Sequence, residues 1–223
     1  MFDLATKYCF HLDKNNTKSL ELFLLLLSLE KYVNGAIIEM NRLEKTRKNI
    51  NKKLANLSQN LGAPRINKFQ LTYLACDTHF FFICIDKCYK LIAQFSLELN
   101  DNGIKKLKTK LNKVFDIATV RNHLEHIEDR CSGYLNLKDK KQNIKKHISD
   151  FGNFAGDDFL FNNKKYPSGK KSLEELKNIY LDLIKILDVR ARKVPEFVRQ
   201  VEMEERHKLT MKTLKKLKHV DVI

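Results

Sequence analysis

Two long stretches of the chain repeat apolar residues at steps of three and four, and this periodicity constrains the fold more than any other feature. The first runs over residues 19–61 and the second over residues 67–99. The positions that mark the two stretches are Leu20, Phe23, Leu24, Leu27, Ile50, Leu54, Leu57 and Leu61, and then Leu74, Thr78, Phe81, Ile85 and Cys88. With seven glycines and three prolines in 223 residues, the chain favours long helices over a turn-rich sandwich or barrel.

Shorter helical patterns follow the Asn100–Gly103 turn. Residues 104–114 place apolar side chains on one side and lysines on the other, and Asp116 is expected to cap a further helical segment. Ser172 and Glu175 predict a capping box that opens a helix reaching Arg190. Pro195 begins a basic C-terminal helix at 195–223. We therefore expect an all-α protein, an elongated antiparallel bundle of about five to six helices, as a single domain over residues 1–223.

Two features interrupt this pattern. Gly35 is expected to mark a kink in the first helix. Residues 134–171 mix aromatic residues with turn residues and predict a loop insertion that contains a short hairpin.

The net charge of +15 favours a polyanionic partner. A second interpretation stays open, because lysines that are spread along a chain also serve simply to solvate helix faces. Residues 1–12 lack the pattern of a signal peptide, and the run Leu22–Leu27 is too short to span a bilayer. We expect a cytoplasmic protein without a membrane partner.

The segment from Arg121 to His126 holds the residues best suited to chemistry. On one helix the two side chains diverge by about 140°, so they do not form a compact pair within one chain. Arg121 instead lies one turn from Glu125, and a surface ion pair is the simplest interpretation. If two copies of the segment met across a twofold axis, two arginines and two histidines would converge on one cleft.

Arginine and histidine together can cleave RNA without a metal. A histidine exchanges protons near neutral pH and can assist attack of a ribose 2′-hydroxyl on the adjacent phosphate. The guanidinium group stabilises the charge that develops on the phosphoryl oxygens. DNA lacks the 2′-hydroxyl and would be inert to this mechanism.

The sequence Arg121-Asn122-x-x-x-His126, within an all-α chain, resembles the Arg-x(4–6)-His signature of the HEPN superfamily. This resemblance implies a small helical homodimer and a metal-independent endoribonuclease of a toxin–antitoxin or phage-defence system, without a cofactor. It also implies that Arg121 and His126 are catalytic and that Asn122 helps orient them. An antitoxin or regulatory protein is a further implied partner. In one HEPN subgroup, a tyrosine two positions after the histidine is modified to switch the protein. Glu128 occupies that place here, so this resemblance does not imply such a modification.

Other residues could support such a site. His123 is either a substrate contact or a surface residue, and Asp77 with His79 form either an auxiliary acid–base pair or buried hydrogen-bonded residues. The RNA-binding lysines that we expect are Lys105, Lys106, Lys110 and Lys113. Two other functions stay open: a HEPN-like helical module that binds RNA or protein without cutting, and an unrelated basic helical protein that binds nucleic acid or scaffolds an assembly.

Overall fold

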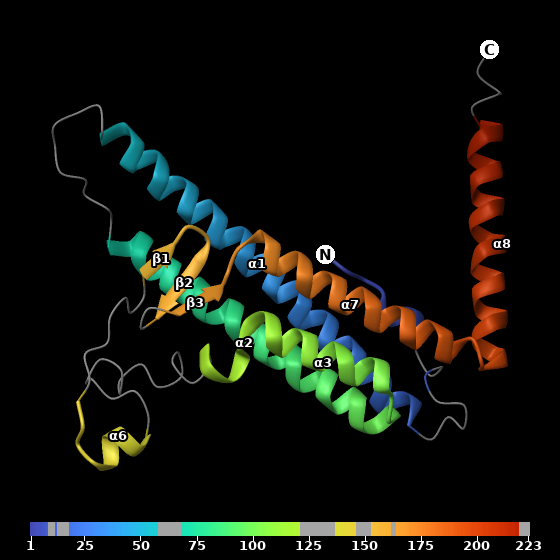
Figure 1. Cartoon of the computed structure of the whole chain (residues 1–223). Helices are drawn as coiled ribbons and strands as arrows, with labels where there is room; N and C mark the ends of the chain where they lie inside the picture. Colours follow the sequence, from blue (N-terminus) through green and yellow to red (C-terminus); the bar gives the residue numbers. More distant parts are fainter. Residues whose placement is uncertain are drawn as a thin grey trace.

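Figure 1 shows the computed structural model of the chain, in which four long helices lie side by side. The structure describes residues 1–8, 12, 18–57, 68–120, 137–145, 153–161 and 164–218. The four helices are α1 (Ser19–Leu57), α2 (Lys68–Leu99), α3 (Asn102–Phe115) and α7 (Lys170–Ala191). Each contacts two neighbours in the order α1, α2, α3, α7, and consecutive helices run in opposite directions. The predicted all-α antiparallel bundle is confirmed.

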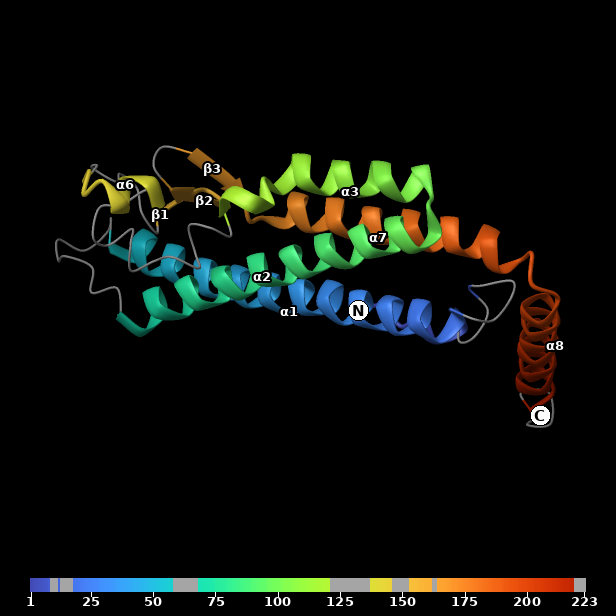
Figure 2. The ribbon, with the colours of Figure 1, turned by 90° about the horizontal axis from the view of Figure 1, so that it is seen from below.

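The bundle has two layers of two helices each. Figure 2 shows α1 beside α2 in one layer and α3 beside α7 in the other. The layers meet over an apolar core, to which α1 contributes one stripe of side chains that are at most 1% exposed: Leu22, Leu26, Leu29, Val33, Ala36, Met40 and Leu43. These positions alternate steps of four and three, as one face of a helix requires. By contrast, Leu20 and Leu24, which helped to predict the helix, are half exposed.

Gly35 does not interrupt α1, which is one continuous helix from Ser19 to Leu57. The helix continues through it (Figure 1). A Cβ atom at this position would lie 3.0 Å from Cys84 Sγ on α2, which is tighter than ordinary van der Waals contact. Gly35 is therefore explained by the close approach of α1 and α2.

The insertion forms a small sheet that closes one end of the α3–α7 layer (Figure 2). Strands β1 (Asn153–Ala155), β2 (Asp158–Phe161) and β3 (Lys164–Pro167) pair antiparallel in that order. Phe159 pairs with Tyr166, and both side chains are buried. The sheet contains the predicted hairpin plus one further strand, and a short helix, α6 (Leu137–Lys141), precedes it.

Helix α7 begins before the predicted cap. Its N-cap is Gly169, and Ser172 lies at the third helical position. Ser172 Oγ accepts a hydrogen bond from the Gly169 backbone N–H at 3.1 Å and donates one to the Gly169 carbonyl at 2.6 Å. The sequence signal identified the correct turn but assigned the wrong residue as its cap.

The N-terminal segment and the first turn of the C-terminal helix meet at the far end of the bundle. A short 3₁₀ helix, η1 (Ala5–Tyr8), packs against α1, and α8 (Pro195–Lys218) follows α7. Phe197 is fully buried, and its ring stacks on Tyr8 with centroids 5.7 Å apart. Beyond this anchor, α8 stands away from the bundle (Figure 1). Within the described residues, no helix combines the length and the apolar character needed to cross a membrane.

Candidate nucleic-acid interface

The predicted catalytic segment lies outside the described residues. Arg121, Asn122, His123 and His126 all belong to residues 121–136, for which the structure gives no description. The chain that leads into this segment is nevertheless well defined. Ile117 and Val120 are 2% and 1% exposed, so the residue directly before Arg121 is anchored in the core.

Asp116 sets the direction in which the chain approaches this segment. It adopts the left-handed conformation (φ 45°, ψ 52°) and ends α3, while its backbone N–H donates to the Asn112 carbonyl. Its own carbonyl accepts from Val120 N–H at 3.2 Å, which opens the next helical turn as predicted. One carboxylate oxygen accepts from Thr119 Oγ1 at 2.8 Å, and the other pairs with Lys164 on β3. The sheet thus fixes the bend before Arg121.

Asp77 and His79 lie in different surroundings on α2. Asp77 faces α1, where it is hydrogen-bonded to Glu39 near Arg42. Burial raises the pKa of both carboxyl groups, although the charge of Arg42 opposes this. The His79 ring lies 6.0 Å from the ring of Phe80. Two positions on a helix are about 200° apart, so the structure does not bring Asp77 and His79 together.

Helix α3 presents the four predicted RNA-binding lysines to solvent. Lys105, Lys106, Lys110 and Lys113 are all exposed. The opposite face is buried and consists of Ile104, Leu107, Leu111 and Phe115. The Asp101 side chain caps the helix by accepting from the N–H groups of Gly103 and Ile104 at 2.7 and 3.1 Å. We call the four lysines the α3 lysine face.

Among the described residues, the α3 lysine face has one paired carboxylate. Among its four members, only Lys110 has an ion pair within the described residues, with Glu175 of α7 at 3.2 Å. Because half-exposed pairs of this kind are weak, Lys110 can exchange the carboxylate for a phosphate at low cost. The face is therefore suited to bind an anionic strand.

Two hollows lie beside these lysines. One, of about 440 Å³, is lined by Asn102, Lys105, Lys106 and Thr109. The other, of about 650 Å³, is the α3–α7 cavity, which is bounded by α3, the end of the sheet and the first turns of α7. Its lining residues are Lys110, Lys113, Val114, Asp157, Asp158, Pro167, Gly169, Lys171, Ser172 and Glu175.

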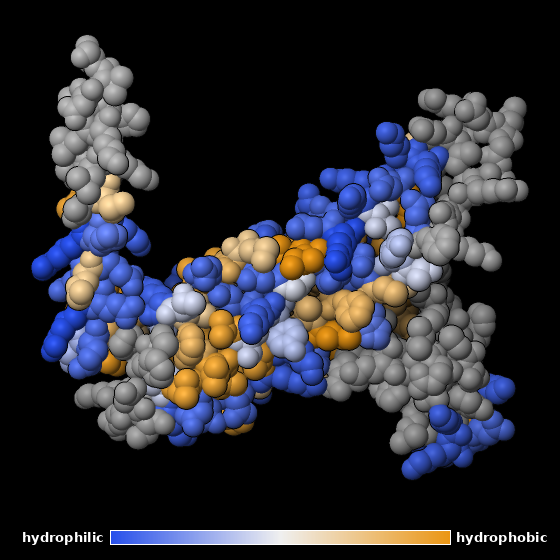
Figure 3. Space-filling model, turned by 180° about the vertical axis from the view of Figure 1, so that it is seen from behind, coloured by the Kyte–Doolittle hydropathy of each residue, from blue (hydrophilic) through white to orange (hydrophobic). Residues whose placement is uncertain are grey.

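The opposite side of the bundle has a different character. Figure 3 shows apolar side chains gathered on the rear face of the molecule. Exposed apolar residues of α1 and α2 include Leu20, Leu24, Ile38 and Phe80, which are 40% to 54% exposed. The apolar patch thus lies on the α1–α2 side of the bundle, away from the α3 lysine face.

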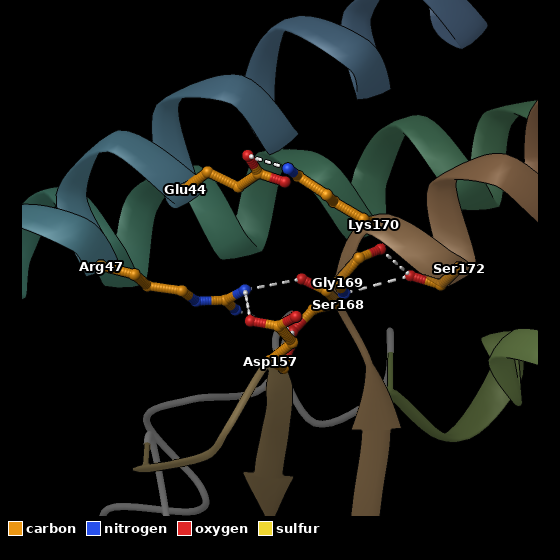
Figure 4. A network of polar contacts seen from close by, with 7 residues as sticks. All are labelled: Glu44, Arg47, Asp157, Ser168, Gly169, Lys170 and Ser172. Atoms are coloured by element: carbon orange, nitrogen blue, oxygen red, sulfur yellow. Dashed lines mark hydrogen bonds and ion pairs between the residues drawn. The ribbon is translucent and has the colours of Figure 1, made fainter. Parts of the chain in front are cut away.

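A buried arginine network was missed by the sequence interpretation. Figure 4 shows Arg47 of α1 reaching the turn between β3 and α7. Its guanidinium group donates to the Ser168 carbonyl at 2.9 Å and to Ser168 Oγ at 3.1 Å, and it lies 3.7 Å from Asp157. Arg47 belongs to a strongly basic run of the sequence, and nothing there distinguishes it from the exposed lysines around it.

Comparison with known proteins was negative at every level. No family model, curated protein or solved structure matches this chain.

Proposed function

We propose that the protein is a metal-independent endoribonuclease of HEPN type that acts on cytoplasmic RNA in a toxin or phage-defence role. The observation that carries this proposal is the position of the α3 lysine face. Helix α3 ends at Phe115, and after one anchored helical turn the chain enters the segment Arg121–His126. Cations that hold a phosphate backbone would then directly precede the residues that act on it.

The proposed reaction needs two chemical roles. His126 accepts the proton of a ribose 2′-hydroxyl as that oxygen attacks the adjacent phosphorus, and the bond from phosphorus to the 5′-oxygen breaks. Arg121 stabilises the negative charge on the phosphoryl oxygens. The leaving 5′-oxygen takes up a proton in place of the one that the 2′-hydroxyl lost, so the products are a 2′,3′-cyclic phosphate and a 5′-hydroxyl and no further reactant is needed.

A homodimer would complete the site by bringing two Arg121–His126 segments together. Asn122 would orient the pair, and His123 would contact the substrate. An antitoxin or regulatory protein would restrain the activity.

The test is RNA cleavage by the full chain in EDTA. Arg121→Ala and His126→Ala should each abolish cleavage while circular dichroism stays unchanged, and Lys185→Ala, an exposed lysine of α7, should cleave like wild type. RNA binding without cleavage by wild type would instead favour the non-catalytic module.

A further inference from the structure

The lining of the α3–α7 cavity holds three lysines and three carboxylates, but they are not all paired with one another. Glu175 pairs with Lys110 at 3.2 Å, and Asp157 lies 3.7 Å from Arg47, which is not part of the lining. Burial lowers the pKa of the Arg47 guanidinium group. The negative charges of Asp157, Glu44 and Asp158 act in the opposite direction and raise this pKa. Two of the three carboxylates are therefore paired with a cation, and one of these cations, Arg47, stands outside the lining.

Two lysines in the lining of the cavity have no carboxylate partner within the described part of the chain. Lys113 on α3 and Lys171 on α7 are exposed, and neither forms an ion pair with another described residue. They come from two different helices and line the same hollow. Two lysines that line one cavity can provide charge-assisted donors for a phosphate.

The rest of the cavity suits an organic group attached to that phosphate. Val114 and Pro167 contribute apolar surface to the lining. The volume of about 650 Å³ lies within the range of small-molecule sites. Gly169 keeps the wall in place, because a Cβ atom there would lie 2.5 Å from the Cβ of Asp157.

We propose that the α3–α7 cavity binds one nucleotide, with its phosphate on Lys113 and Lys171 and its base against Val114 and Pro167. The inference rests on the proposed function in one respect: the nucleotide belongs to the RNA strand that lies along the α3 lysine face. The carboxylate of Asp158 can accept a hydrogen bond from an exocyclic amino group, which favours adenine, cytosine or guanine over uracil.

The experiment measures binding of 5′-AMP, adenosine and inorganic phosphate to the full chain by NMR titration. The cavity variant is Lys113→Gln with Lys171→Gln. The matched control removes the same charge at exposed positions of α1 and α7, by Lys31→Gln with Lys185→Gln. We expect AMP to bind wild type and control equally and to bind the cavity variant at least about tenfold more weakly. Adenosine and phosphate alone should each bind more weakly than AMP.

Three results would overturn the inference: no AMP binding to wild type at millimolar concentration, equal AMP binding to the cavity variant, or equal binding of phosphate and AMP. Cleavage assays on the same proteins separate this inference from the proposed function. AMP binding at the two lysines in a chain that never cuts RNA would reject the proposed function alone. Cleavage that requires His126 in a chain that does not bind AMP would reject the nucleotide site alone.

Discussion

Arg47 and Ser168, 121 residues apart in the chain, are joined by two hydrogen bonds inside the protein. The Arg47 side chain is only 10% exposed, and its donors hold the turn that connects the sheet to α7. This contact attaches the insertion to α1 and so positions one wall of the α3–α7 cavity (Figure 4).

Arg47→Met should therefore lower the free energy of unfolding by about 2 kcal/mol, because the buried Ser168 carbonyl and hydroxyl lose a cationic donor. Urea unfolding followed by circular dichroism measures this change. Lys48→Met is the control, since Lys48 is an exposed neighbour on α1, and its effect should be within about 0.5 kcal/mol. Equal stability of the two variants would show that the network does not hold the insertion.

Glu30 ties the N-terminal segment to the core. Its carboxylate is 5% exposed, accepts from the N–H groups of Leu4 and Ala5 at 2.7 and 3.1 Å, and accepts from the Tyr180 hydroxyl. Tyr180→Phe removes one donor from this buried charge and should destabilise the fold by about 1–3 kcal/mol in thermal unfolding.

Tyr32→Phe serves as the control for Tyr180→Phe, because the described residues give the Tyr32 hydroxyl no hydrogen bond. It should unfold close to the wild-type temperature. If both tyrosine variants lose the same stability, the effect comes from the aromatic ring and the role assigned to Glu30 is wrong.

The carboxyl pair of Glu39 and Asp77 predicts a pH dependence. Burial raises the pKa of both groups above their ordinary values of 4.5 and 3.8. The folded state therefore holds protons that the unfolded state releases, and the free energy of unfolding falls as pH rises above these values. Asp188 has the opposite effect on the pH dependence of stability. Lys7 and Arg192 outweigh the effect of burial and lower the pKa of its carboxyl group.

Asp77→Asn isolates the contribution of this pair. The amide keeps a hydrogen-bonding group beside Glu39 but cannot take a second negative charge. We expect the variant to gain stability relative to wild type as pH rises from 4 to 7, in urea unfolding at several pH values. A constant difference over this range would mean that the pair does not titrate on unfolding.

The α3 lysine face predicts the salt dependence of RNA binding. Each lysine that neutralises a phosphate of single-stranded RNA contributes about −0.7 to the slope of log K against log salt. Replacing Lys105, Lys106 and Lys113 by glutamine should reduce the slope by about 2 and weaken binding. Fluorescence anisotropy at several salt concentrations measures this slope. A variant with Lys31, Lys87 and Lys185 replaced by glutamine is the charge-matched control. A slope that falls equally in both triple variants would assign no special role to α3.

Much of this fold could be predicted from the sequence because its signals are local. Helix spacing predicted α1, α2 and α3, and Pro195 predicted the start of α8 to the residue. The buried face of α1 was less predictable, since Leu20 and Leu24 look as apolar as Leu22 and Leu26. Which of them meets the core depends on where α2 and α7 pack.

The candidate interface, too, could be predicted from the sequence only in part. The exposure of the α3 lysines follows from their position opposite a buried stripe, so it could be predicted. Arg47 contacts residues more than a hundred positions away, and Lys171 shares its cavity with α3 residues more than fifty positions away. No periodicity in the chain encodes those contacts, and the cavity they border became visible only in the structure.

The most direct test of the central claim is the chemistry of the cut. A single-stranded RNA is incubated with wild type and with His126→Ala in EDTA, beside a strand that carries 2′-deoxyribose at the cleaved position. The account predicts that wild type leaves 2′,3′-cyclic phosphate ends and that both the variant and the deoxy strand stay intact. Cleavage of the deoxy strand, or full activity of His126→Ala, would contradict it.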